Sequence, residues 1–206
     1  MLSNAPVHFT VLINIGLAFI PFVLAYLLFK RPMQPQKRHH HVIWWLGVCI
    51  YILFLPNSAY TLTDIIHYFA AAKSPDVSAA QFWLMLTPLY LLYFVVCFEF
   101  YVISITWGRQ YFSPYVSPAM LNALTIALQA LIALGVYLGR FQRLESYDIL
   151  NKPQIIFQDI YKDLTSLNSL LIIAGLFAFY TVFYCLFCYI NRHVQRRFSH
   201  IPATNV

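Results

Sequence analysis

Charged residues are scarce in this sequence. Only 10% of its 206 residues are Asp, Glu, Lys or Arg, whereas soluble domains carry roughly 25%. Hydrophobic residues make up 61% of the chain, so too little polar surface is present to cover a soluble globule. The composition excludes a soluble globular fold and predicts a polytopic membrane protein.

Several chemical signatures are also missing. The chain has no glycine-rich phosphate loop, no G-x-S-x-G turn and no H-E-x-x-H metal motif, and no motif identifies a cofactor. The net charge of +6 comes from short segments between apolar runs, without a basic face, which argues against nucleic acid as a partner. The four cysteines all lie in apolar runs, so they predict packing residues and no disulfide framework.

Long apolar runs dominate what is present. A helix needs about 20 residues to cross a ~30 Å hydrocarbon core. Five spans are predicted, at about residues 9–29, 42–55 continuing to about 72, 82–106, 118–138 and 167–190. The predicted fold class is therefore all-α, a polytopic membrane helix bundle. Residues 1–206 are interpreted as a single transmembrane domain in contact with membrane lipids.

The second span contains a proline, Pro56. Proline removes a backbone donor and clashes with the preceding helical turn. We expect the span to be kinked or broken at Pro56 and then to continue as a helix to the outer boundary of the membrane. The alternative is a half-helix followed by a re-entrant or interfacial segment through about Ala72.

The segment after Pro56 carries a polar stripe. Asn57, Tyr60, Asp64 and His67 recur at spacings of three, four and three residues, which places them on one face of a helix. An amide, a carboxylate and an imidazole are costly at the edge of an apolar slab unless they have partners. The stripe is the first candidate site.

Charge predicts the orientation of the chain. The segments after the first, third and fifth spans contain no acidic residue, but they hold eight basic ones: Lys30, Arg31, Lys37, Arg38, Arg109, Arg192, Arg196 and Arg197. The positive-inside rule places these segments in the cytoplasm. The sequence thus predicts a multi-pass protein of the cell membrane, with its N-terminus outside and its C-terminus cytoplasmic.

A second polar group follows the fourth span, on the same predicted outer side as the stripe. It includes Arg140, Arg143 and Asp148. If the two groups meet, one of these arginines is expected to pair with Asp64 or Asp148 through a charge-assisted hydrogen bond. Residues 155–164 alternate apolar and polar side chains at helical period, which predicts a short amphipathic helix at the outer interface.

Two stretches resemble a known family. The first runs from Leu55 to His67 (LPNSAYTLTDIIH) and the second from Tyr137 to Asp148 (YLGRFQRLESYD). They are similar to the LPN-x-x-Y-x-x-T-D-x-x-H and G-R-F-x-R-W-N-S-W-D stretches of a bacterial integral-membrane family, domain of unknown function 1361. The departures from that pattern are Leu144, Glu145 and Tyr147. The resemblance implies a multi-spanning membrane protein without an established activity.

The first interpretation of the polar groups is structural. Asn57 would satisfy carbonyls that Pro56 leaves without donors. Asp64 and His67 would tie the second span to the loop after the fourth. The protein would then be an accessory or scaffolding protein of the cell envelope, with a membrane protein or a second copy of itself as a possible partner.

The alternative is a membrane-embedded hydrolase or transferase that acts on a lipid-linked substrate. Asp64 and His67 would supply two ligands to a divalent metal, with Asp148 as a third. Without a metal, His67 would act as general base, oriented by Asp64. Arg140 and Arg143 would hold a phosphate or carboxylate head group.

A second alternative is a small oligomeric proton-coupled transporter. Apart from Asp64 in the continuation of the second span, Glu99 is the only acidic residue within a predicted span, and helix rise places it roughly 10 Å from the inner end of that span. A lone carboxyl group at this depth is expected to be protonated or hydrogen-bonded. Glu99 would be either a proton-relay residue or a polar contact between helices, and five spans without a repeat are few for a transporter unless it oligomerises.

Overall fold

The computed structural model describes residues 7–30, 42–73, 78–142 and 165–199, which are almost entirely helical, with no strand among them. Five of these helical segments are long and apolar enough to cross a membrane: Val11–Lys30, Val42–Ala72, Ala79–Phe112, Pro118–Arg140 and Leu167–Arg197. The prediction of an all-α membrane bundle is confirmed, and the chain is a multi-pass membrane protein. The interpretation as a single domain stays a prediction. The expected amphipathic helix at 155–164 lies outside the described residues.

Most spans combine an α-helix with a short turn of another helix type. The first is α1 (Val7–Ala25) with the π-helical turn η1 (Tyr26–Lys30). The second is α2 (Val42–Tyr60), the 3-10 turn η3 (Thr61–Asp64) and α3 (Ile65–Ala72). The third is α4 (Ala79–Gln81), the π turn η4 (Phe82–Leu86) and α5 (Thr87–Phe112). The fourth is α6 (Pro118–Tyr137) with the π turn η5 (Leu138–Gln142), and the fifth is α9 (Leu167–Ser199).

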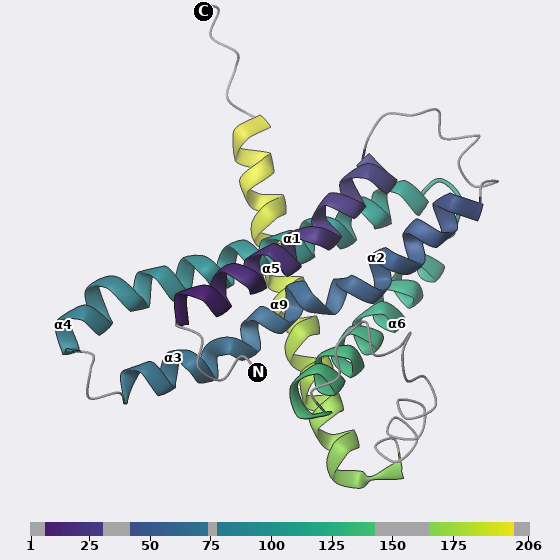
Figure 1. Cartoon of the computed structure of the whole chain (residues 1–206). Helices are drawn as coiled ribbons and strands as arrows, with labels where there is room; N and C mark the ends of the chain where they lie inside the picture. The colour runs from purple at the N-terminus through teal and green to yellow at the C-terminus, as the bar shows by residue number, and fades with distance from the viewer. Residues whose placement is uncertain (1–6, 31–41, 74–77, 143–164, 200–206) are drawn as a thin grey trace, which may run out of the picture.

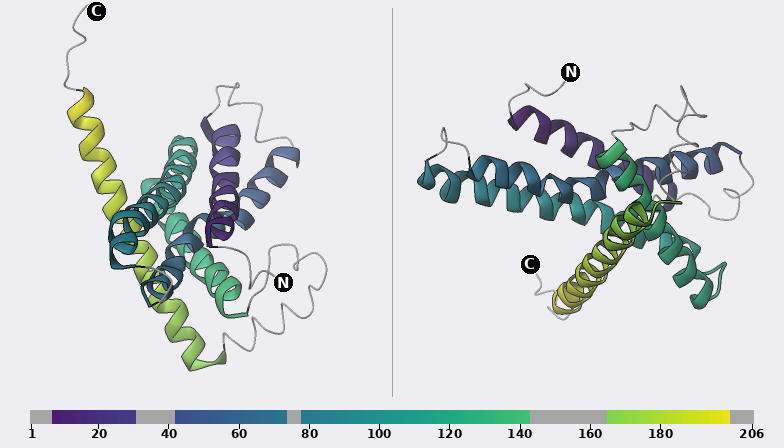
Figure 2. Two further views of the ribbon diagram at one scale, coloured as in Figure 1. Left: turned by 60° about the vertical axis from the view of Figure 1, so that its left-hand side comes forward. Right: turned by 90° about the horizontal axis from the view of Figure 1, so that it is seen from below.

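The spans form two groups. Helices α1, α2 and α5 pack against one another and form the first group. Helices α6 and α9 form the second group, and α6 contacts the first group mainly at α2. Figures 1 and 2 show α9 crossing the α1–α2–α5 layer at a large angle. The core lies around this crossing, and its largest fully buried apolar side chains come from four of the spans: Leu55, Phe98, Tyr101, Ile132 and Tyr180.

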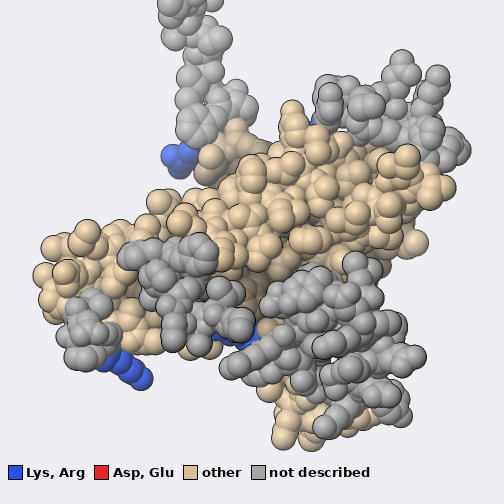
Figure 3. Space-filling model, in the orientation of Figure 1, with Lys and Arg blue, Asp and Glu red and all other residues tan. Residues whose placement is uncertain are grey.

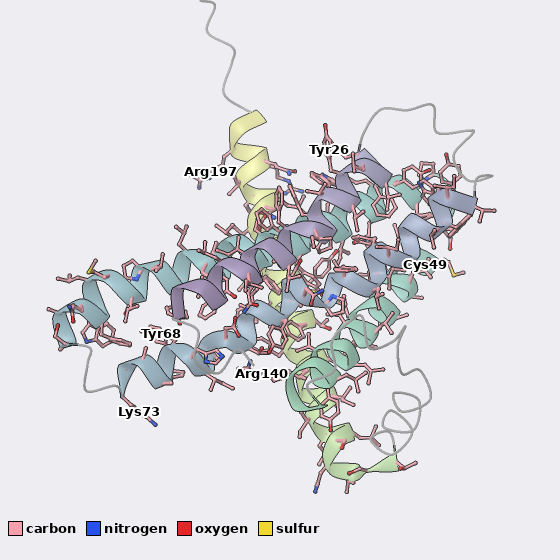
Figure 4. The ribbon with its side chains drawn as sticks, in the orientation of Figure 1. Tyr26, Cys49, Tyr68, Lys73, Arg140 and Arg197 are labelled. Atoms are coloured by element: carbon pink, nitrogen blue, oxygen red, sulfur yellow. The ribbon has the colours of Figure 1, made fainter. Side chains whose placement is uncertain are left out.

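The surface of the bundle is apolar, as lipid contact requires. Large hydrophobic side chains such as Val42, Ile43 and Leu84 are exposed. The described part of the face in Figure 3 shows a few Lys and Arg side chains and no Asp or Glu. Figure 4 identifies two of these basic side chains as Lys73, at the end of α3, and Arg197, near the end of α9. The distribution agrees with spans immersed in lipid.

The second span continues as a helix beyond Pro56. The α-helix passes through Pro56 to Tyr60, and the change of helix type comes one turn later, in η3. There the hydroxyl of Thr61 donates to the Ser58 carbonyl (2.8 Å), and the hydroxyl of Thr63 donates to the Tyr60 carbonyl (2.6 Å). Hydroxyl groups that bond back to carbonyls in this way compete with helical donors. The interruption therefore reflects these threonines as well as the proline.

Pro56 also fixes the approach of a neighbouring helix. A methyl group built on Gly135 of α6 would lie 2.8 Å from Cγ of Pro56. The absence of a side chain at Gly135 thus lets α6 approach α2 at the proline ring, as small residues do between membrane helices. Because this contact lies inside one chain, it positions η5 and Arg140 against the second span.

Candidate functional site

The carboxylate of Asp64 is the centre of the candidate site. Asp64 ends η3 and is 3% exposed. Its Oδ2 accepts hydrogen bonds from Asn14 Nδ2 of α1 and from the Tyr93 hydroxyl of α5, each at 2.7 Å. Its Oδ1 lies 3.5 Å from Nη1 of Arg140 in η5. Segments from four spans therefore meet at one buried carboxylate.

Arg140 is held in place by the same turn that carries Asp64. Its Nη1 donates to the Tyr60 hydroxyl at 2.8 Å, and its Nη2 donates to the Thr63 carbonyl at 3.0 Å. The guanidinium also lies 5.4 Å from the centroid of the Tyr60 ring, which is cation–π geometry. Figure 4 shows Arg140 at the junction of α2 and α3. We call Asn14, Tyr60, Asp64, Tyr93 and Arg140 the Asp64 cluster.

His67 lies beside the Asp64 cluster without a hydrogen bond to it. Its Nε2 is 4.0 Å from Asp64 Oδ1, beyond hydrogen-bonding distance, and its side chain is 53% exposed. Asn57 is half-buried on α2, and its side chain has no hydrogen bond within the described part of the chain. The hydroxyls of Thr61 and Thr63 in η3 bond to the carbonyls of Ser58 and Tyr60.

Two of the three predicted metal ligands, Asp64 and His67, are among the described residues. Among residues 7–30, 42–73, 78–142 and 165–199, no three His, Cys, Asp or Glu side chains are grouped as metal ligands. Asp148, the predicted third ligand, and Arg143 lie outside these ranges. What the described residues provide is a carboxylate with partners from three other spans and an exposed imidazole nearby.

Glu99 is distant from this cluster in the sequence and has a partner of its own. Its Oε1 accepts a hydrogen bond of 2.5 Å from Nδ2 of Asn191, which joins α5 to α9. Two polar residues of α6 have other partners. Asn122 accepts from Arg109 at 2.8 Å, and Gln129 accepts from the Tyr101 hydroxyl.

Two members of the Asp64 cluster were not predicted from the sequence. Asn14 is the only amide or charged residue in the apolar run 9–29, so its isolation was a usable signal. Tyr93 is one of fifteen tyrosines and has no distinguishing neighbour in the sequence. Its role follows only from the packing of α5 against η3.

Ser58 adds a contact next to the cluster. Its buried hydroxyl donates to the Ala18 carbonyl of α1 at 2.7 Å. Together with the bond from Asn14 to Asp64, this fixes α1 against the second span at two points about one turn of α1 apart. Such polar contacts hold membrane helices together where the hydrophobic effect does not.

Comparison with known protein families gives a match over most of the chain. The family model DUF1361, described as a protein of unknown function, matches residues 13–186. No curated protein and no solved structure was found to be similar to the chain. The matched range includes every member of the Asp64 cluster, from Asn14 to Arg140. Because the match covers most of the sequence, this chain belongs to the DUF1361 family of proteins of unknown function.

Proposed function

We propose that this protein is an accessory or scaffolding protein of the cell membrane, and that the Asp64 cluster holds its helices in register. One observation carries the proposal. Both oxygens of the buried Asp64 carboxylate are occupied by side chains from three other spans. A carboxylate surrounded in this way has little capacity left for a metal or a substrate, whereas it is well placed to join helices.

The proposed orientation puts the N-terminus outside and the C-terminus in the cytoplasm. In support, the described residues place Lys30, Arg109 and Arg192 around one cavity at one end of the bundle. Their gathering at one end is the charge asymmetry that the positive-inside rule describes. Attachment of membrane-impermeant cysteine-reactive labels to cysteines placed at Lys73 and at Arg197, added from each side of the membrane, tests the orientation.

A complementation experiment tests the proposed function. In cells that lack this protein, His67→Ala is expected to restore the wild-type phenotype in full. Asp64→Asn should restore it only in proportion to the folded protein left in the membrane, because the carboxylate stabilises the fold. The amount of folded protein is measured as the monodisperse peak in size-exclusion chromatography of detergent-solubilised membranes. Loss of the phenotype in His67→Ala at a normal protein level would contradict the scaffold role.

One observation favours the enzyme as a second candidate. His67 is exposed next to a buried carboxylate, an arrangement in which a histidine can exchange protons with a bound substrate. The same complementation separates the two functions, since a general base is lost in His67→Ala while the fold stays intact. Elemental analysis of the purified chain for bound divalent metal tests the metal-dependent form, with Asp64, His67 and Asp148 as its ligands.

The transport alternative depends on Glu99. The bond from Asn191 gives its carboxyl group a partner on another helix, which supports the interhelical contact over a proton relay. Measurement of proton flux in proteoliposomes, with Glu99→Gln as the comparison, tests it. If the wild type conducts protons and Glu99→Gln abolishes this proton flux, the protein is a transporter and the scaffold proposal is wrong.

A further inference from the structure

A cavity lined by both polar and apolar side chains lies at the other end of the bundle from the Asp64 cluster. It has a volume of about 560 Å³ and is formed by the end of η1, the last turns of α5, the start of α6 and the second half of α9. Tyr93 and Arg109 are both on α5, so helix rise separates the cavity from the Asp64 cluster by roughly 24 Å. The two sites are therefore distinct.

Three cations line this cavity. Lys30 ends η1, Arg109 lies in the last turn of α5, and Arg192 is on α9. No ion pair with a carboxylate is formed by any of the three within the described ranges, in contrast to Arg140. Asn191, which lines the cavity, donates a hydrogen bond to Glu99 of α5, and Glu99 itself is not among the lining residues. The cavity thus carries positive charge without a neutralising side chain from the described residues.

The Arg109 charge is held at a fixed position. Its Nη1 donates to the Leu121 carbonyl at 3.3 Å and to the Thr125 hydroxyl, and its Nη2 donates to Asn122 at 2.8 Å. All three acceptors are uncharged groups of α6, so the guanidinium keeps its full positive charge. A guanidinium that is fixed before a ligand arrives loses little conformational freedom on binding.

The rest of the lining is amphipathic. Gln110, Asn191 and Gln195 add hydrogen-bonding groups beside the cations, whereas Ile103 and Leu121 add apolar wall. A ligand that suits this lining has an anionic, oxygen-rich head and an apolar part. Basic pockets between membrane helices bind phospholipid head groups in this way.

We propose that this cavity binds the phosphate group of an anionic phospholipid, with Lys30, Arg109 and Arg192 around the phosphate and the acyl chains along the apolar wall. A free phosphate ion is also anionic, but it has no apolar part that could contact that wall. The location favours the lipid, because the cavity is formed between spanning helices that lipid surrounds. The proposal is independent of the function proposed for the Asp64 cluster.

Lipid retention by the purified full-length chain tests the proposal. The chain in neutral detergent is titrated with phosphatidylglycerol or with phosphatidylcholine of the same acyl chains, and bound lipid is measured by native mass spectrometry. We expect the wild type to retain phosphatidylglycerol preferentially. The Lys30→Gln and Arg192→Gln substitutions should each weaken retention about fivefold, and together about twenty-fivefold.

Arg197→Gln is the matched control. Arg197 is on α9 like Arg192, is exposed and does not line the cavity. Removal of its charge should therefore leave the preference for phosphatidylglycerol unchanged. Lys30 and Arg192 are exposed as well, and their substitution is not expected to unfold the chain. An equal loss in Arg197→Gln, or equal retention of the two lipids, would overturn the site. Displacement of the lipid by an equal concentration of inorganic phosphate would overturn the lipid as its ligand.

Discussion

Arg140→Ala is expected to lower the free energy of unfolding by about 3–5 kcal/mol, because it leaves a buried carboxylate without its cation. Asp64 is 3% exposed and would keep only the neutral donors Asn14 and Tyr93. The substitution also removes two hydrogen bonds between η5 and the second span, to Tyr60 and to the Thr63 carbonyl. Unfolding of the purified chain by a denaturing detergent, followed by circular dichroism, measures the loss.

A double-mutant cycle separates the charge pair from the rest of the effect. Asp64→Asn removes the carboxylate charge, so Arg140→Ala should cost less in that background than in the wild type. A coupling free energy of about 0.5–3 kcal/mol is typical of residues that share one network. Arg140→Lys keeps the charge, but its single ammonium nitrogen replaces the two Nη atoms that bond to the Tyr60 hydroxyl and to the Thr63 carbonyl. Its stability should therefore lie between those of the wild type and Arg140→Ala. Additive losses would show that the two side chains act independently.

The fold was predictable because the membrane constrains it strongly. With no water in the bilayer core, the backbone must satisfy its own hydrogen bonds, so an apolar run of sufficient length has to be a helix. The run that ends near Leu55 was the difficult case. Its continuation to Ala72 depended on whether Pro56 ends the helix, and the structure shows that the α-helix passes it to reach Tyr60.

Only part of the candidate site could be predicted from the sequence. The spacing of Tyr60, Asp64 and His67 indicated where polar groups gather, and either Arg140 or Arg143 was the expected partner of Asp64 or Asp148. The structure brings Asp64 and Arg140 to 3.5 Å. Helical periodicity reports on the face of one helix and contains no information about the neighbours of that face. Tyr93 is the clearest example, since only the packing of α5 against η3 brings its hydroxyl to Asp64.

The basic side chains at the two ends of the bundle have different partners. At the Asp64 end, Arg140 is matched by a carboxylate and an aromatic ring. At the cavity, Lys30, Arg109 and Arg192 meet no carboxylate in the described residues. A buried cation that holds helices together needs an internal partner, whereas a cation that binds a ligand must leave its charge available. This contrast is why we assign a structural role to the first end and ligand binding to the second.

Gly135→Ala is expected to destabilise the protein by about 1–3 kcal/mol through overpacking, although alanine is the better helix former. The new methyl group would lie 2.8 Å from Cγ of Pro56 and 3.1 Å from its Cβ. The proline ring is rigid and cannot rotate away, so α6 must move from α2. Because η5 continues α6, that movement also pulls Arg140 away from Asp64. The same denaturing-detergent titration measures the loss.

Gly175→Ala is the matched control, since it makes the same change inside another helix, α9. No atom lies within 4 Å of a methyl group built there, so the helix propensity of alanine should leave stability unchanged or raise it by up to about 1 kcal/mol. Pro56→Ala removes the Cγ atom that the new methyl group meets, and it should therefore reduce the cost of Gly135→Ala. Equal stability of Gly135→Ala and Gly175→Ala would show that α6 does not depend on this close approach to position Arg140.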